Sequence, residues 1–88
     1  MRARLDELGE LLHDALSPTS IAWQDDSHLH AGHAGAREGG HYRLHIVSPR
    51  FAGLSRIARH RLIYDALSPL AERGIHALQI DARSPDEP

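Results

Sequence analysis

Apolar residues near the start of the chain recur at three- and four-residue spacing. The members of this stripe are Leu5, Leu8, Leu12, Ala15 and Leu16. Such spacing places side chains on one face of an α-helix, which buries that face against a core. We therefore predict an amphipathic helix over residues 4–16, ended by Ser17 and Pro18.

Two later segments alternate with a period of two, which a helix cannot use. Residues 19–25 carry Ile21 and Trp23 among smaller or polar neighbours, and this pattern predicts a short half-buried strand. Residues 41–48 form the clearer strand. Its two faces carry Tyr42, Leu44 and Ile46 on one side and His41, Arg43 and His45 on the other. The two strands are joined by one loop, so we expect them to pair antiparallel.

A second helix is predicted after Ser55, which can cap its N-terminus. Its apolar positions are Ile57, Ile63, Tyr64, Ala66, Leu67 and Leu70. Pro69 in a helix interior would cost about 3 kcal/mol, because it removes a hydrogen bond and its ring meets the preceding turn. We expect a break near Leu67, after which Ser68 caps a final turn with Pro69 at its first position.

A third strand is predicted over residues 75–82, with His76, Leu78 and Ile80 on one parity. The helical segment before it permits a parallel crossover from the second strand. The fold class that follows is α+β, with the order α-β-β-α-α-β and a three-stranded mixed sheet covered on one face by helices. We expect residues 1–83 to form one domain and residues 84–88 a flexible tail.

Composition narrows the function. A chain of 88 residues supports one small core. The net charge of −2 gives no long-range electrostatic attraction for a nucleic-acid backbone, so nucleic-acid binding would need a local patch of arginine and histidine. The absence of cysteine excludes disulfides, a thiolate nucleophile and sulfur ligands from this chain. Neither a signal segment nor an apolar run of membrane length is present, so we expect a cytoplasmic protein that binds no membrane. No serine lies in a nucleophile-elbow context, and we do not expect an enzyme.

Four of the eight histidines lie within residues 25–43, and this stretch is the first candidate site. His28, His30 and His33 stand at spacings of two and three, close enough for two of them to share a transition-metal ion. A solvated connector rich in glycine, alanine and histidine is the alternative interpretation. His76 could likewise be a ligand, or a histidine at the edge of the core that bonds a backbone carbonyl.

A basic group on the second predicted helix is the other candidate. Arg56 and the run Arg59, His60 and Arg61 could form a helix face that contacts phosphates. The alternative is an ordinary solvated helix surface.

Several short motifs occur in a fixed order between Asp25 and Pro85. They read D-x-S-x-x-H, H-[FY]-x-[VL], S-x-x-F-x-G, R-H-R-x-x-Y and I-H-A-L. In this order and combination the chain resembles the BolA family. The resemblance departs from the family at Pro69, where the helix usually continues, and in the length and histidine content of the loop.

The resemblance implies a class II KH-like fold that lacks the G-x-x-G phosphate clamp of true KH domains. It also implies a partnership with a monothiol glutaredoxin of the CGFS type and a shared 2Fe-2S cluster. In that role His76 is a cluster ligand and His30, the sixth residue of D-x-S-x-x-H, is the loop ligand, with His33 as a possible substitute. A glutaredoxin cysteine and glutathione would supply the other two of the four ligands. We expect the isolated protein to be a monomer without the cofactor.

An alternative function follows from the same resemblance. The segment RFAGLSRIARHRLIY is similar to the helix-turn-helix-like part of the family, which underlies the proposal that some members regulate transcription. The partner would then be duplex DNA, contacted by Arg56, Arg59, His60 and Arg61.

Overall fold

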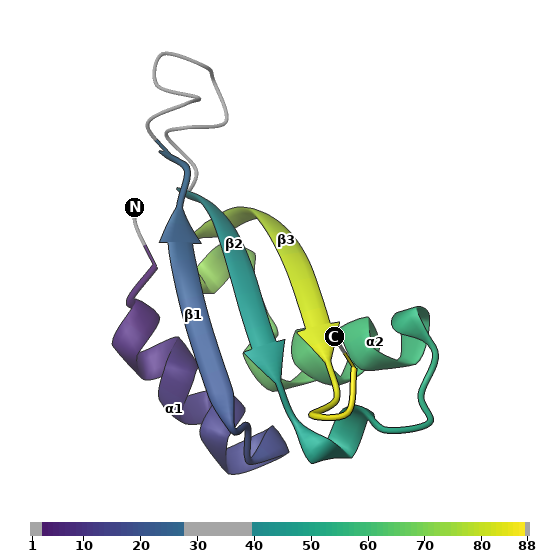
Figure 1. The fold of residues 1–88 in the computed structure, drawn as a ribbon. Coiled ribbons are helices and arrows are strands. Elements are labelled where there is room, and N and C mark those ends of the chain that lie inside the picture. Colours follow the sequence, from purple (N-terminus) through teal and green to yellow (C-terminus); the bar gives the residue numbers. More distant parts are fainter. Residues whose placement is uncertain (1–2, 28–39, 88) are drawn as a thin grey trace.

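The structure is a computed structural model that describes residues 3–27 and 40–87 (Figure 1). Two helices and three strands form its frame. Their bounds are α1 (Leu5–Leu16), β1 (Ser20–Asp25), β2 (Gly40–Val47), α2 (Arg56–Leu67) and β3 (Ile75–Arg83). Short 3₁₀ turns at Pro49–Phe51 and Ala71–Arg73 precede and follow α2.

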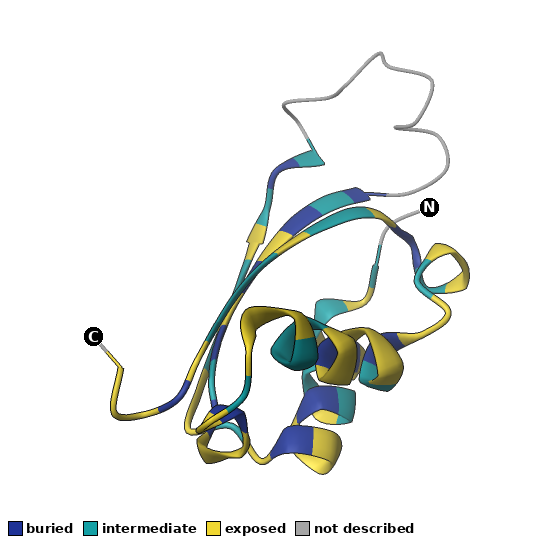
Figure 2. Cartoon of the chain, turned by 90° about the vertical axis from the view of Figure 1, so that its right-hand side faces the viewer, coloured by how far each residue is buried: buried dark blue, intermediate teal, exposed yellow. Residues whose placement is uncertain are grey.

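The strands form one mixed sheet in the order β1-β2-β3. β1 pairs antiparallel with β2, where Trp23 lies opposite Leu44, and β2 pairs parallel with β3, where Leu44 lies opposite Ile80. Both helices cover the same face of this sheet and leave the other face bare (Figures 1 and 2). The predicted fold class, an α+β domain with a three-stranded mixed sheet covered on one face, is confirmed.

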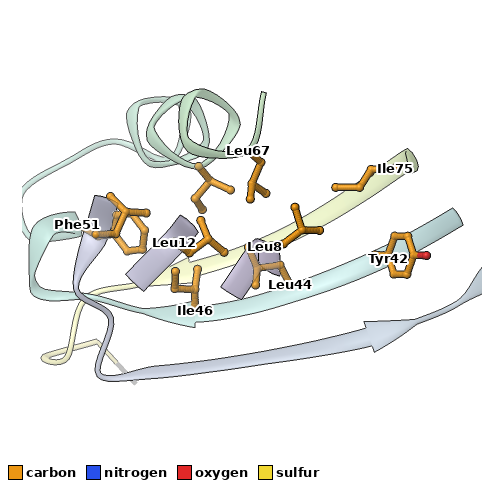
Figure 3. Close-up of a cluster of buried hydrophobic side chains, with 10 residues drawn as sticks. Leu8, Leu12, Tyr42, Leu44, Ile46, Phe51, Leu67 and Ile75 are labelled. Atoms are coloured by element: carbon orange, nitrogen blue, oxygen red, sulfur yellow. The ribbon is translucent and has the colours of Figure 1, made fainter. Parts of the chain in front are cut away.

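The core lies between the sheet and the two helices (Figure 3). Its buried residues are Leu8, Leu12, Leu16, Tyr42, Leu44, Ile46, Phe51, Ile63, Leu67 and Ile75. Both predicted periods are visible in this set, because α1 contributes positions three or four residues apart and β2 contributes every second residue. The central strand therefore carries the middle of the core, and its alternate side chains point to the bare face.

The second helix buries less than its apolar content predicted. Only Ile63 and Leu67 are buried, whereas Ile57 is 68% exposed and Tyr64 is 38% exposed. Ile57 and Tyr64 are seven residues apart and share a helix face different from that of Ile63 and Leu67. The apolar residues of α2 therefore do not lie on a single buried face. In α1, Ala15 was expected in the buried stripe and is exposed instead.

α2 ends at Leu67, where a break was predicted. The backbone N–H of Ser68 donates to the carbonyl oxygen of Tyr64 and closes the helix. The next turn is a single 3₁₀ turn that begins after Leu70, so Ser68 and Pro69 do not start it as predicted. Within the described ranges, no helix has the length and apolar character needed to cross a membrane.

Candidate functional site

His76 lies at the start of β3, beside an irregularity in the ladder between β2 and β3. Gly40 lies opposite Ile75 and His41 lies opposite Ala77. His76 is therefore an additional residue in β3 with no paired residue on β2. An added residue reverses the alternation of side chains along a strand. Accordingly, Ile75 is buried and His76 is exposed.

The same reversal corrects a prediction from the sequence. Beyond the irregularity, Leu78 and Ile80 pack against the core, although His76 has the same parity in the sequence. His76 therefore does not share their face, and the interpretation of His76 as a histidine at the edge of the core does not hold. Its exposure leaves the imidazole accessible from outside the domain.

His76 lies next to a second imidazole. The ring centroids of His41 and His76 are 5.1 Å apart, and the ring planes are inclined by 54°. His41 is half-buried and belongs to the polar side of β2, which the helices do not cover. The two side chains come from neighbouring parallel strands, and the irregularity at His76 brings them to the same side of the sheet.

The backbone of His41 is tied to the end of β1. Its N–H donates to the hydroxyl oxygen of Ser27 over 3.0 Å, and its carbonyl oxygen accepts from the N–H of Asp26 over 2.8 Å. Ser27 is itself held in a turn, because its N–H donates to the Asp25 carboxylate. The D-x-S part of the D-x-S-x-x-H motif thus has a structural role, which is to fasten the end of β1 to His41.

An ion pair between the buried Asp26 and the exposed Arg43 strengthens this junction. The Asp26 carboxylate lies 2.6 Å from the guanidinium of Arg43 and also accepts from the Gln24 amide. Gly40, at the other end of the loop, donates its N–H to the carbonyl oxygen of Gly74 over 2.9 Å. A Cβ on Gly40 would lie 2.3 Å from the Tyr42 hydroxyl, so this close approach requires glycine.

Both ends of the histidine-rich loop are therefore fixed beside the start of β3. His28, His30 and His33 lie outside the described residues. Among the residues that are described, no group of three or more histidine, cysteine, aspartate or glutamate side chains could hold a metal ion. The described part of the site offers imidazole nitrogen from His41 and His76, and further ligands would come from the loop or from another molecule.

The basic residues of α2 separate into two kinds. Arg59 points inward and is 13% exposed. Its guanidinium donates to the carbonyl oxygens of Leu54 and Ala82, each over 3.0 Å, and pairs with the Glu87 carboxylate at 2.5 Å. Arg56 and Arg61 are exposed, and His60 is half-buried.

Three of these residues meet at a cleft of about 530 Å³ between the start of α2 and the end of β3. The lining residues are Leu54, Arg56, Arg59, His60, Asp81, Ala82, Arg83 and Glu87. Arg61 is not among them. Asp81 and Glu87 place two carboxylates within the same basic cleft, and they offset part of its positive charge.

These carboxylates are stabilised in their ionised form. Hydrogen bonds from Arg59 and then from Ser84 lower the pKa of Glu87 to about 2. The Arg83 guanidinium donates to Asp81 and lowers its pKa, partial burial opposes this shift, and a hydrogen bond with His45 adds to it. Residues 84–87, which we expected to belong to a flexible tail, form a turn in which Ser84 is buried and both its N–H and its hydroxyl donate to Glu87.

Two features of the site were not singled out from the sequence. His41 reaches His76 only because of an added residue in the ladder, which strand periodicity alone does not show. Glu87 lies within an acidic and proline-containing end of the chain, a composition that is typical of solvated tails. The histidine at the start of H-[FY]-x-[VL] was nevertheless a visible signal for His41, because it opens the central strand.

Solved structures resemble this arrangement closely. BolA1 from Arabidopsis thaliana has a TM-score of 0.80 and 31% sequence identity, and the match covers 100% of both chains. The BolA domain of SufE1 from the same plant has a TM-score of 0.77 and 44% identity, covering 91% of this chain and 90% of that one.

A sequence relative gives the same result. The UV-induced protein uvi31 of Schizosaccharomyces pombe is 41% identical over 90 residues, which cover 96% of this chain and 88% of the relative. Residues 12–87 match the family model described as BolA-like protein, and these residues include β1, β2, α2 and β3 in full. With that match, the order of motifs and the fold in agreement, the chain belongs to the BolA family.

Proposed function

We propose that this protein is an adaptor that binds a monothiol glutaredoxin of the CGFS type and shares a 2Fe-2S cluster with it, in iron-sulfur trafficking or iron sensing. His76 is the fixed ligand from this chain, and His30 of the loop is the second, with His33 as its possible substitute. The glutaredoxin cysteine and glutathione supply the remaining two ligands. The protein acts in this role as a binding partner and not as an enzyme.

The observation that carries this proposal is the position of His76. It is exposed at the end of the sheet where both ends of the histidine-rich loop are fastened. His30 follows Ser27 by three residues, and covalent geometry limits that separation to roughly 11 Å. A loop histidine is therefore within reach of the region around His41 and His76, and a partner can approach from outside.

The donor chemistry fits a shared cluster. Imidazole is an established ligand of 2Fe-2S clusters, in which histidine in place of cysteine raises the reduction potential. This chain has no cysteine, so it contributes no thiolate ligand. Thiolates must then come from a partner, as a cluster bound by four ligands requires. When bound, the cluster would supply a one-electron couple or a transferable iron-sulfur unit.

The pair of histidines predicts different effects of two substitutions. His76→Ala should abolish formation of the shared cluster, because His76 is held on a strand and its imidazole is presented without a large ordering cost. His30→Ala should still give a heterocomplex, with an altered or more labile cluster, because ordering a loop to bind costs conformational entropy. His13→Ala is the matched control, since His13 is exposed on α1, on the other side of the sheet.

The experiment is to mix each variant anaerobically with cluster-loaded glutaredoxin and to record visible absorption and circular dichroism spectra. Wild type and His13→Ala should convert the glutaredoxin homodimer spectrum into that of a heterocomplex, and His76→Ala should leave it unchanged. A His76→Ala protein that yields the same cluster spectrum and stability as wild type would show that the ligand assignment is wrong.

Binding of duplex DNA receives no comparable support. Arg59, one of the four residues expected to contact phosphates, uses its guanidinium to bond the protein's own backbone and Glu87. Arg56, His60 and Arg61 remain as the basic side chains of that alternative. The carboxylates of Asp81 and Glu87 lie in the cleft that Arg56 and His60 line, and they disfavour a polyanion there.

A further inference from the structure

We propose that His41 and His76 form a two-imidazole site for one divalent transition-metal ion, and that the isolated protein binds this ion without a glutaredoxin. The site shares His76 with the proposed function, but it adds His41 as a ligand and needs no loop residue. The ligand class is a first-row ion that favours nitrogen, such as Zn²⁺, Ni²⁺ or Cu²⁺.

The distance between the rings fits this role. A zinc-bound imidazole nitrogen lies about 2.0–2.1 Å from the metal, and the ring centre is about 1 Å further away. Two imidazoles on one tetrahedral ion therefore have ring centres roughly 5 Å apart. The centroids of His41 and His76 are 5.1 Å apart with planes inclined by 54°, a separation that requires little rearrangement of either backbone.

The backbones that carry the two rings are fixed independently of any metal. His41 lies in the central strand, and its N–H and carbonyl oxygen are bonded to Ser27 and Asp26. His76 follows Ile75, which is 3% exposed and anchors the start of β3 in the core. A site built on strands loses less entropy on binding than one built on a loop, so these two rings are better prepared to bind than loop side chains.

The surroundings are compatible with a cation. Arg43 lies on the same side of β2, two residues along the strand from His41, and its charge is balanced by the Asp26 carboxylate at 2.6 Å. His76 is exposed, so water or a group from a partner can complete the coordination. Two imidazoles leave two positions of a tetrahedral ion open, which is the arrangement of a site that accepts an external ligand.

The test uses the full chain with the loop histidines removed. In a parent variant carrying His28→Gln, His30→Gln and His33→Gln, Zn²⁺ alone is titrated by calorimetry, and the imidazole resonances are followed by NMR. We expect one zinc ion per chain and shifts of the His41 and His76 resonances. Adding His41→Gln or His76→Gln should weaken zinc binding about tenfold or more, because each removes one arm of a chelate.

A double-mutant cycle distinguishes one shared ion from two separate sites. If both rings bind the same ion, the double variant should bind zinc little worse than either single variant, whereas independent sites would give additive losses. His45→Gln is the control on the same strand and the same side, and His13→Gln is the control on α1. Neither control should change the affinity.

A second substitution, His41→Asn, separates ligation from folding, because the backbone bonds of His41 to Asp26 and Ser27 remain. It should weaken zinc binding as much as His41→Gln does and keep the melting temperature of the parent. A zinc affinity that is unchanged by His41→Gln and by His41→Asn, or additive losses in the cycle, would overturn the inference. Because no glutaredoxin is present, this result is independent of the cluster-transfer experiment, and either proposal can fail while the other stands.

Discussion

Arg59→Met should destabilise the domain, because Arg59 is a structural residue of the described fold. Its guanidinium bonds the carbonyl oxygen of Leu54 before α2 and that of Ala82 in β3, and it pairs with Glu87 near the C-terminus. One side chain therefore ties three separate segments together. Methionine preserves most of the apolar stem and removes only the charged donors.

The magnitude follows from these contacts. A hydrogen bond that involves a charged group contributes roughly 1.5–3 kcal/mol, and bonds made by one side chain are not additive. The Arg59 side chain is 13% exposed, so water competes little for its hydrogen bonds in the native state. Water can enter the open cleft after the substitution and satisfy part of the freed carbonyls. We therefore expect a loss of about 2–3 kcal/mol in the free energy of unfolding.

Thermal unfolding followed by circular dichroism measures this loss. For a domain of this size the melting temperature should fall by roughly 10–20 °C. Arg61→Met is the matched control, since Arg61 is exposed on the same helix and its substitution should change the stability by less than about 0.5 kcal/mol. Equal melting temperatures for the two variants would refute the structural role of Arg59 and return it to the residues available for binding DNA.

Two further predictions concern the same end of the molecule. The double charge reversal Arg56→Glu and Arg61→Glu should remove whatever affinity the wild type has for duplex DNA and reduce the dependence of that affinity on salt, while the fold is retained. Fluorescence anisotropy with labelled duplex DNA measures this affinity. Tight, sequence-specific binding by the wild type that is lost in the variant would favour the DNA-binding alternative. Because the pKa of Glu87 is lowered to about 2, its ionised carboxylate stabilises the fold fully above pH 4.5, the ordinary value for this group, and this contribution is lost as the pH falls toward 2. The melting temperatures of wild type and Glu87→Gln should therefore differ at neutral pH and converge near pH 2; a difference that stays constant down to pH 2 would contradict the assigned role of Glu87.

The sequence predicted those parts of the fold in which apolar residues repeat at a regular spacing. The stripe Leu8, Leu12 and Leu16 and the alternation of Tyr42, Leu44 and Ile46 each mark a buried face, and both are observed. The second helix was harder because its apolar residues point in more than one direction. Ile57 and Ile63 look alike in sequence, and only the packing of α2 on the sheet decides which of them is buried.

The candidate site was predictable only in part for a related reason. His76 was recognised from its motif, but its orientation depends on one added residue opposite Gly40 and His41, a property of the paired strands. The basic run on α2 was visible, whereas the inward turn of Arg59 depends on carbonyl oxygens at Leu54 and Ala82 and on Glu87. Periodicity reports which face a residue occupies, and it contains no information on partners from distant segments.

The fastening of Ser27 to His41 and of Gly40 to Gly74 has an evolutionary consequence. The two anchor points are set by the sheet, so the connection between them can change in length without moving either one. Closing a longer connection costs only about 0.6 kcal/mol of loop entropy for each doubling of its length. Insertions and deletions between these anchors therefore change the free energy of folding little. Selection can vary the number and spacing of the histidines while the sheet that presents His76 stays the same.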